Sequence, residues 1–445
     1  MSNTAYIPDS MKENFDWWNR TYKSARKNSV EIVDGAHIST RLKNERLHGF
    51  MRSDCGVFRP DGTYITGSNM WKPHEELSGI IPLDAPMLDA NLVWGGELLN
   101  HYGHFLIQST ARLYYYLQHL NEYDGIIFVW NYEFSIPAYM TEFLKLAGVP
   151  MDKIKIAPHP VRVRRLAVPT LSSFYHEDWT EDFLIPFQNA NAAVAPGKNK
   201  KIFMSRKNWT LLKADVLGEM DVMLAFQKNG FVPIYPEQLS IAGQIAVIKG
   251  AEEIAGVAGT ALHNIIYAAG CSDKKRVIML SRSPVNNVQF ILNEMVDADL
   301  VAIAAFHNFL PISYSDGPFI IGMTGHLRQF FIDNNMRGAE IKFRPEKYAK
   351  KFLNKYVQIY QFSDFYLDLI DNEANKVEAK DFIGLVELSN WPRLRRFYYK
   401  IMSRFAFSEL TRISANYKFY TLDNLLKGDF VKRARGGGGG GGGGG

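Results

Sequence analysis

The chain has 445 residues, of which 47% are hydrophobic and 22% charged, a balance typical of a globular protein of about two domains. Its two cysteines, Cys55 and Cys271, have neither a metal-binding spacing nor a disulfide framework, which favours a reducing cytoplasm. The N-terminus lacks the apolar core of a signal peptide, and no apolar run reaches the length of a membrane span, so export and membrane insertion are not expected.

Residues 1–75 are mixed and polar, and they predict an N-terminal extension with some strands. From residue 76 to residue 188, short apolar runs alternate with helical patterns, which predicts a first βα domain. Within it, the continuous apolar run Ile126–Trp130 is typical of a strand buried on both faces. Leu106, Leu113 and Leu117 recur at helical spacing and predict a helix from Tyr102 to Leu120.

Three polar residues of this helix, His104, Gln108 and Arg112, are spaced four residues apart and should share one face. That face is either solvated or the wall of a cleft. A histidine near a helix start can act as a general base because its ordinary pKa lies near neutral pH, while the alternative is a structural histidine.

Residues 189–200 are small and polar with proline and glycine, and they predict a linker between domains. A second βα series follows over residues 201–333. Because strands alternate with helices, we expect an α/β fold with parallel sheets and a ligand site at the carboxyl ends of the strands. Pro233 indicates that the strand containing it lies at an edge. The expected strands of this series are Lys201–Ser205, Phe231–Tyr235, Glu253–Val257 and Arg276–Leu280.

The stretch Ala251–Gly270 is the centre of this second series. It predicts a short strand, a Gly/Thr turn and a helix that begins at Ala261, an arrangement that can hold phosphate against backbone N–H groups. Neither the P-loop spacing nor the dinucleotide-binding glycine pattern is present. Thr260 can contribute its hydroxyl, and His263 or Asn264 can cap the helix or reach a sugar or base, while the alternative for His263, favoured by its helical setting alone, is a satisfied helix histidine.

Ser205, Arg206 and Lys207 lie at the carboxyl end of the first strand of the second series. Two cations at a strand end can neutralise a diphosphate, and arginine offers a planar fork for phosphate oxygens; the alternative is an ordinary basic pair on the surface. No metal site is expected. Asp297 and Asp299 match a D-x-D pattern only formally, because their surroundings are apolar.

The positive charge of the chain is concentrated near its C-terminus. Residues 390–435 hold eleven Lys and Arg against three Asp and Glu, a balance of +8, while the whole chain carries +5. Residues 334–435 predict a mostly helical basic segment, with Arg396, Lys400 and Arg404 on one face of an amphipathic helix. This segment either rests on an anionic membrane surface or packs on the N-terminal domain. The glycines of residues 436–445 form no core, and no nucleic-acid partner is expected.

Three stretches together resemble the family 61 glycosyltransferases. GHFLIQSTARL resembles the family's first motif, KIFMSRK its strand-end motif, and the longer block Gly230–Ala268 its closing motif. The resemblance covers roughly residues 103–280. It implies a GT-B fold, in which two Rossmann-like domains face a central cleft, and an inverting transfer of a sugar from a nucleotide-sugar without a bound metal or another cofactor.

Carried over by position, the resemblance implies a donor site on the second domain and a catalytic residue on the first. Arg206 would hold the donor diphosphate, with Ser205 and Lys207 beside it, and His104 matches the histidine of the first motif. The turn Gly259, Thr260 and Ala261 would supply backbone contacts. The remaining matches are Gln244 and Asn264, with His263 next to Asn264.

The sequence departs from the family pattern at the position of the expected base. The family usually has Glu or Asp four residues after its histidine, and here this residue is Gln108, whose amide accepts no proton at neutral pH. Either His104 is the base, or Asp89 or Glu97 replaces the missing carboxylate, or the activity is weak or altered. Gly243 stands where the family has Glu, and Thr260 where it commonly has Ala.

The expected function is therefore a bacterial glycosyltransferase of surface polysaccharide or capsule synthesis, located either in the cytoplasm or peripherally at the inner face of the cell membrane. A UDP-sugar is the expected donor, and a glycan or lipid-linked glycan is the expected acceptor. The alternative is an inactive or altered GT-B-like protein that binds a nucleotide or glycan.

Overall fold

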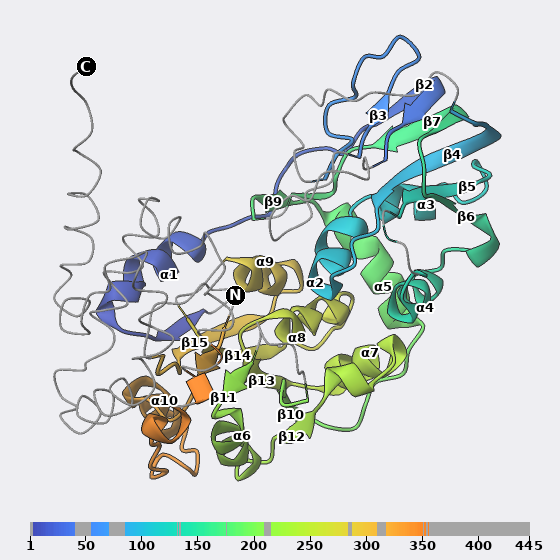
Figure 1. Ribbon diagram of the computed structural model, residues 1–445. Helices are drawn as coiled ribbons and strands as arrows, with labels where there is room; N and C mark the ends of the chain where they lie inside the picture. The colour runs from blue at the N-terminus through green and yellow to red at the C-terminus, as the bar shows by residue number, and fades with distance from the viewer. Residues whose placement is uncertain are drawn as a thin grey trace, which may run out of the picture.

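Two six-stranded sheets organise the residues that the structure, a computed structural model, describes (Figure 1). The described residues are 3–40, 55–70, 85–130, 132, 135–174, 176–208, 215–283, 287–308, 317–349, 351–352 and 355. We call the sheet of residues 30–169 with its helices up to residue 192 the first half, and residues 201–333 with their sheet the second half.

The sheet of the second half is parallel throughout, in the order β1-β15-β14-β13-β10-β12. Its strands are β1 (Thr4–Tyr6), β10 (Lys201–Met204), β12 (Val232–Ile234), β13 (Glu253–Val257), β14 (Arg276–Ser281) and β15 (Asp299–Ala304). The expected parallel sheet is confirmed here, and β12, which contains Pro233, lies at the edge as predicted.

Successive side chains of these strands point to opposite faces of the second sheet, and those on both faces are apolar and buried. Ile202 and Met204 face a core shared with α7, α8 and α9, whereas Phe203 faces a core shared with α6 and α10. The sheet is therefore covered by helices on both sides, as in doubly wound α/β proteins. The helices are α6 (Glu219–Gln227), α7 (Ile241–Gly250), α8 (Thr260–His263), α9 (Val288–Met295) and α10 (Gly325–Asp333).

The sheet of the first half is mixed, in the order β3-β2-β7-β4-β5-β6. Strands β7, β4, β5 and β6 are parallel, while β2 runs antiparallel to both β7 and β3. The strands are β2 (Val30–Ile38), β3 (Val57–Phe58), β4 (Met87–Glu97), β5 (Gly125–Val129), β6 (Ile154–Ala157) and β7 (Val161–Pro169). Strand β5 is buried on both faces, as its apolar sequence predicts.

The N-terminal residues complete both sheets. Strand β1 pairs with β15 in the second half, and β2 pairs with β7 in the first half. Between them lies α1 (Lys12–Trp18). A strand pairing across some 300 residues leaves no local pattern, so a reading of short-range signals treats these residues as an extension.

Helices of the two halves pack against each other and share one continuous core. The carboxylate of Glu142 on α4 accepts from the backbone N–H groups of Ile241 and Ala242, both at 3.0 Å, at the start of α7. It thereby satisfies two N–H groups that a helix start leaves without an intrahelical partner. Helix α5 runs to Ala192, so the first residues of the expected linker are helical. The helices of the first half are α2 (Tyr102–His104), α3 (Leu113–Gln118), α4 (Ala138–Leu146) and α5 (Ile185–Ala192).

Smaller elements complete the described chain. Two further sheets have two short strands each. One pairs β8 (Ser173–Phe174) with β9 (Asp178–Trp179), and the other pairs β11 (Val216–Leu217) with β16 (Phe319–Ile320). Among the residues described, no helix is long and apolar enough to cross a membrane. The expected amphipathic basic helix near Trp391 lies outside the described residues, as does most of the segment 334–435.

Gly125 begins β5 at a point where the neighbouring backbone leaves no room for a side chain. A Cβ at this position would lie 2.0 Å from the carbonyl oxygen of Lys153. We expect Gly125→Ala to lower the free energy of unfolding by about 1–3 kcal/mol, the usual effect of overpacking. Denaturant unfolding measures this change, and Gly325→Ala, where nothing lies within 4 Å of the added Cβ, should change stability little. An unchanged midpoint for Gly125→Ala would contradict the close approach of β5 and β6.

Candidate functional site

Two of the predicted segments follow neighbouring parallel strands of the second half. Ser205–Lys207 comes directly after β10, and Ala258–Ala261 comes after β13, with Met204 paired to Gly256. Strand β10 lies between β12 and β13, so the strand order reverses at this point. Such a reversal is where open α/β sheets bind ligands, at the carboxyl ends of the strands.

Gly259 lets the Arg206 guanidinium lie against the turn after β13. Its φ of +139° is one that side chains rarely adopt, and a Cβ there would lie 2.5 Å from Nη1 of Arg206. The same Cβ would lie 3.6 Å from Nη2 of Arg282, which follows β14. The ends of three adjacent strands therefore bring two arginines and a glycine turn together.

Glu219, the first residue of α6, supports Arg206 from behind. Its Oε1 accepts from the Arg206 backbone N–H at 2.6 Å, and its side chain is buried. Burial raises the pKa of the Glu219 carboxyl, while the Arg206 N–H and the Ser205 hydroxyl act in the opposite direction. Ser205 is fully buried and accepts from the Lys207 N–H at 3.2 Å, whereas the Lys207 side chain is exposed.

Helix α2 of the first half lies against α8 of the second half (Figure 1). A Cβ at Gly103 would lie 3.1 Å from Cγ2 of Thr260 and 3.5 Å from Nδ1 of His263. The rings of His101 and His104 are 4.7 Å apart. His101 of the first half and His263 of the second therefore lie within reach of the Arg206 charge, and His104 lies beside His101.

The surroundings keep these histidines neutral. Burial first, and then the charges of His101, His104 and both arginines, lower the pKa of His263 to about 3. Crowding by protein atoms, followed by the charges of His104 and Arg206, lowers the pKa of His101 to about 4. Within the described residues, the buried atoms Nε of Arg206 and Nδ1 of His263 have no hydrogen-bond partner. This cluster of cations and neutral rings is suited to an anion.

His104 is oriented by Gln108, four residues along the chain. His104 Nδ1 and Gln108 Oε1 are 2.6 Å apart, and with the amide oxygen facing the ring, Nδ1 carries the proton. The neutral ring then has Nε2 as its acceptor nitrogen. Burial lowers the pKa of His104, the bond to Gln108 raises it, and the charge of His176 lowers it again.

The expected helix over Tyr102–Leu120 is present but interrupted. Residues 105–109 form a π-helical turn and a non-helical turn follows before α3. The interruption separates Arg112 from the face of His104 and Gln108, so the predicted three-residue face is wrong in this part. Arg112 is fully buried and donates to the carbonyls of Pro169, Gly67 and Ser68.

Gln244 and Asn264 lie one layer below the cluster and bind Tyr102. The Tyr102 hydroxyl is 2.7 Å from Asn264 Oδ1 and 3.0 Å from Gln244 Oε1, and Asn264 Nδ2 donates to Gln244 Oε1 at 2.6 Å. Asn264 is fully buried. The polar atoms of both side chains are therefore engaged inside the protein, whereas a donor contact for them stays a prediction.

The two carboxylates considered as replacements for the base have different positions. Asp89 is near the start of β4, where it pairs with Arg164 at 2.6 Å. Eight residues of strand, roughly 25 Å, separate it from the carboxyl end that carries the histidines. Glu97 is at that end but buried. Among the described residues, no group of three His, Cys, Asp or Glu is placed to hold a metal ion.

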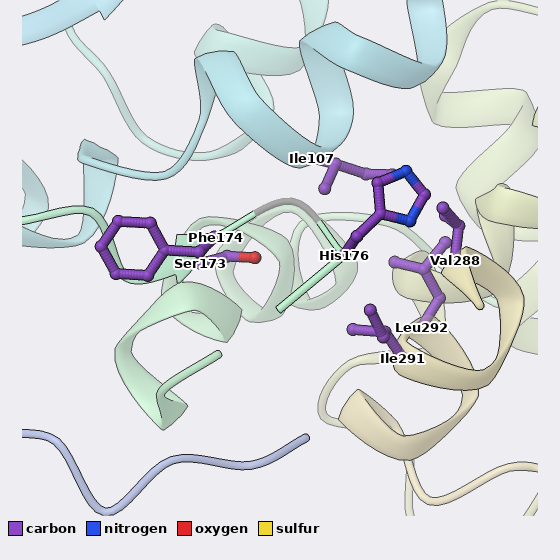
Figure 2. A pocket seen from close by; sticks show the side chains of 7 residues that line it. All are labelled: Ile107, Ser173, Phe174, His176, Val288, Ile291 and Leu292. Carbon is purple, nitrogen blue, oxygen red and sulfur yellow. The ribbon is translucent and has the colours of Figure 1, made fainter. Parts of the chain in front are cut away.

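A small cavity lies beside the His104 helix, between the halves (Figure 2). Figure 2 shows the His176 ring between Ile107 and Val288. His176 has a φ of +68°, and Asn287 binds both its ring nitrogen Nδ1 and its backbone oxygen. The cavity has a volume of about 10 Å³, space for one water at most, so it cannot hold a sugar.

A family model for glycosyltransferase 61 matches residues 102–279. This match supports glycosyltransferase family 61. The family 61 segment begins at α2 and ends in β14, so it spans His104, Arg206 and the turn after β13, and it supports a glycosyltransferase activity for the chain. No curated protein matches the chain.

Among solved structures, the iron-containing dodecameric glycosyltransferase TibC from enterotoxigenic E. coli H10407 shows a weak similarity. The identity is 10%, the match covers 60% of this chain and 81% of the other, and the TM-score is 0.24. A TM-score of this size supports no conclusion about the present chain.

The sequence motifs do not indicate Arg282 or Glu219, which the structure places near Arg206. A signal for Arg282 exists, because Ser281–Ser283 follows an apolar strand just as Ser205–Lys207 does. Glu219 carries no comparable signal, since its role depends on the fold that places α6 behind Arg206.

The lowered histidine pKa values predict acid lability. The unfolded chain binds protons near the ordinary value of about 6.5, whereas folded His263 does so only near 3, so stability should fall as the pH drops between these values. Unfolding measured from pH 7 to pH 4 should show a shallower loss in His263→Gln than in the wild type. His119→Gln, at an exposed pair with Glu122, controls for removing a histidine elsewhere. Equal slopes for wild type and His263→Gln would contradict the neutral cluster.

Proposed function

We propose that the protein is an inverting glycosyltransferase that moves a sugar from a nucleotide-sugar, in the first instance a UDP-sugar, to a glycan acceptor. Its place would be bacterial surface polysaccharide or capsule synthesis, and its two halves would act as a GT-B pair. The observation that carries the proposal is the cluster of Arg206, Arg282 and His263 on the second half, directly beside the His104–Gln108 pair of the first.

The donor diphosphate would bind the arginines and the turn Gly259–Ala261. Arg206 lies against that turn, and its guanidinium provides charge-assisted hydrogen bonds to phosphate oxygens. As the bond between the sugar C1 and the phosphate oxygen breaks, negative charge grows on the leaving nucleoside diphosphate. Fixed cations that already face this position stabilise the transition state more than the ground state.

The acceptor hydroxyl would be activated by His104. Its oxygen forms the new bond to C1 from the face opposite the leaving group, and its proton passes to Nε2 of His104. The hydrogen bond to Gln108 fixes the tautomer that makes Nε2 the accepting nitrogen. Gln108 would thus be a positioning residue, and His104 the general base.

Arg206 and Arg282 can supply the charge that a metal ion provides in other sugar transferases, and we therefore expect no metal requirement. A panel of UDP-, GDP- and CMP-sugars, assayed for slow donor hydrolysis with and without EDTA, tests donor use and metal dependence together. Activity lost in EDTA and restored by added metal would refute the metal-independent mechanism.

The substitution of a carboxylate by Gln108 favours one alternative, a GT-B-like protein that binds a nucleotide or glycan without turnover. Both proposals share the diphosphate site and differ only in the base. Donor binding without hydrolysis or transfer, over the whole panel and a range of glycan acceptors, would support the alternative.

For the basic residues 390–435 we keep both sequence-based proposals, contact with an anionic membrane near a lipid-linked acceptor or packing on the first half. Co-sedimentation with vesicles of anionic or neutral lipid distinguishes them. Binding to the anionic vesicles alone, lost at high salt, supports the membrane surface.

Arg206→Ala should weaken donor binding by about 10- to 150-fold, because it removes charge-assisted bonds worth about 1.5–3 kcal/mol. Arg206→Lys should recover part of the loss, since lysine keeps the charge but not the planar fork. Isothermal titration with the nucleoside diphosphate measures both effects. Arg164→Ala, at an exposed pair with Asp89 near the start of β4, should bind normally. If Arg206→Ala binds the nucleoside diphosphate as tightly as the wild type, Arg206 is not the residue that holds the donor diphosphate.

His104→Ala should lose transfer by about 100- to 10,000-fold, the usual contribution of a general base, while donor affinity is kept. Gln108→Glu restores a carboxylate beside the ring and should raise the pKa of His104, which moves the acidic limb of the pH–rate profile to higher pH. Rates of sugar transfer measured from pH 5 to pH 9 test both variants. Full transfer by His104→Ala would exclude His104 as the base.

A further inference from the structure

Tyr102 links the catalytic helix of the first half to the second half through its hydroxyl. The residue lies between His101 and Gly103 on α2, at the contact with α8. Three polar atoms of the second half surround the hydroxyl, namely Asn264 Oδ1 at 2.7 Å, Gln244 Oε1 at 3.0 Å and the Tyr267 hydroxyl at 3.0 Å. A single side chain thus joins α2 to α7 and to the 3₁₀ turn (Asn264–Ala268) that follows α8.

The partners of Tyr102 are themselves held in place. Gln244 Nε2 donates to the carbonyl of Pro236 at 3.1 Å, and Asn264 Nδ2 donates to Gln244 Oε1 at 2.6 Å. Asn264 and Tyr267 are fully buried. Each amide therefore has its geometry set by the second half before Tyr102 is added, and a buried, satisfied network of this kind fixes one arrangement of its members.

Asn264 is the residue that follows His263, and Tyr102 precedes the Gly103–His104 pair by one position. A shift of the Tyr102 hydroxyl relative to Asn264 would move the His104 ring relative to His263 and the Gly259 turn. Misplacement of reacting groups by about 1 Å can reduce a rate by about 100-fold without a change in the groups themselves.

We propose that Tyr102 is a positioning residue whose hydroxyl, which donates to Asn264 Oδ1 and lies 3.0 Å from Gln244 Oε1, sets the distance between the base on the first half and the donor site on the second. This inference rests on the proposed function. It assigns Gln244 and Asn264 to the support of the base rather than to the donor, although the sequence motif places them in the donor-binding block.

The test compares Tyr102→Phe, Asn264→Ala and their double variant in the full chain. Phenylalanine keeps the edge-to-face contact with Tyr139 but removes the hydroxyl. We expect each single variant to lower kcat for transfer at least tenfold while the donor Kd changes less than threefold. Because both variants break one link, the double variant should have a kcat close to that of the worse single variant.

Tyr115→Phe is the matched control. Its hydroxyl is bonded to Tyr123 at 2.8 Å within the first half, so it should cost a similar hydrogen bond and leave kcat unchanged. Thermal unfolding of all variants confirms that rates are measured on folded protein. If Tyr102→Phe does not fold, Asn264→Ala tests the same link from the other half with Tyr102 in place.

Two results would overturn the inference. One is a kcat within twofold of the wild type in Tyr102→Phe or Asn264→Ala. The other is a donor Kd weakened more than tenfold in Asn264→Ala with an unchanged kcat, which would make Asn264 a donor-binding residue. Arg206→Ala and His104→Ala are measured in parallel. If they keep binding and transfer, the donor site and the base of the proposed function are wrongly assigned; if they lose them while Tyr102→Phe keeps its kcat, only the role of Tyr102 fails.

Discussion

The approach of Gly103 to Thr260 and His263 places the groups of the site relative to one another. A Cβ at Gly103 would lie 3.1 Å from the Thr260 methyl, so the close approach of α2 to this turn leaves little room for a side chain at position 103. Since α2 carries His101 and His104, and the turn at Thr260 lies against Arg206, one backbone contact brings the two halves into a common electrostatic environment. The hydrogen bond from Tyr102 to Asn264 then fixes the orientation of α2 relative to the second half.

The environment of Arg206 and Arg282 determines which neighbouring groups carry a charge. Both arginines remain protonated at neutral pH, and crowding beside them keeps His101 and His263 neutral. Glu219, the acidic group behind Arg206, accepts from its backbone N–H. In the proposed function a diphosphate would lie against these cations, and they would stabilise the charge that grows on it as it leaves.

The parts of the fold that local sequence determines were predictable. The apolar run Ile126–Trp130 predicts a strand buried on both faces and Lys201–Ser205 predicts a strand, and both strands are present. The glycine turn after β13 lies beside Arg206, although the phosphate contact itself stays a prediction. The pairing of β1 with β15 and the support of Arg206 by Glu219 depend on contacts between distant segments, which no local period encodes. The misassigned face at Arg112 has a different origin, because a π-helical turn changes the residue spacing inside one helix.

Gln108 is the residue on which the proposed role of His104 as a base depends, because its amide oxygen lies 2.6 Å from Nδ1 of the ring. An amide oxygen fixes the tautomer of the histidine as a carboxylate does, but it lacks the negative charge that would stabilise the imidazolium. Burial lowers the pKa of His104 more than the hydrogen bond to Gln108 raises it, so the ring is neutral and able to accept a proton at neutral pH. Replacing the carboxylate by an amide therefore makes His104 a weaker base but leaves the ring unprotonated. A weaker base favours acceptor hydroxyls that are themselves comparatively acidic.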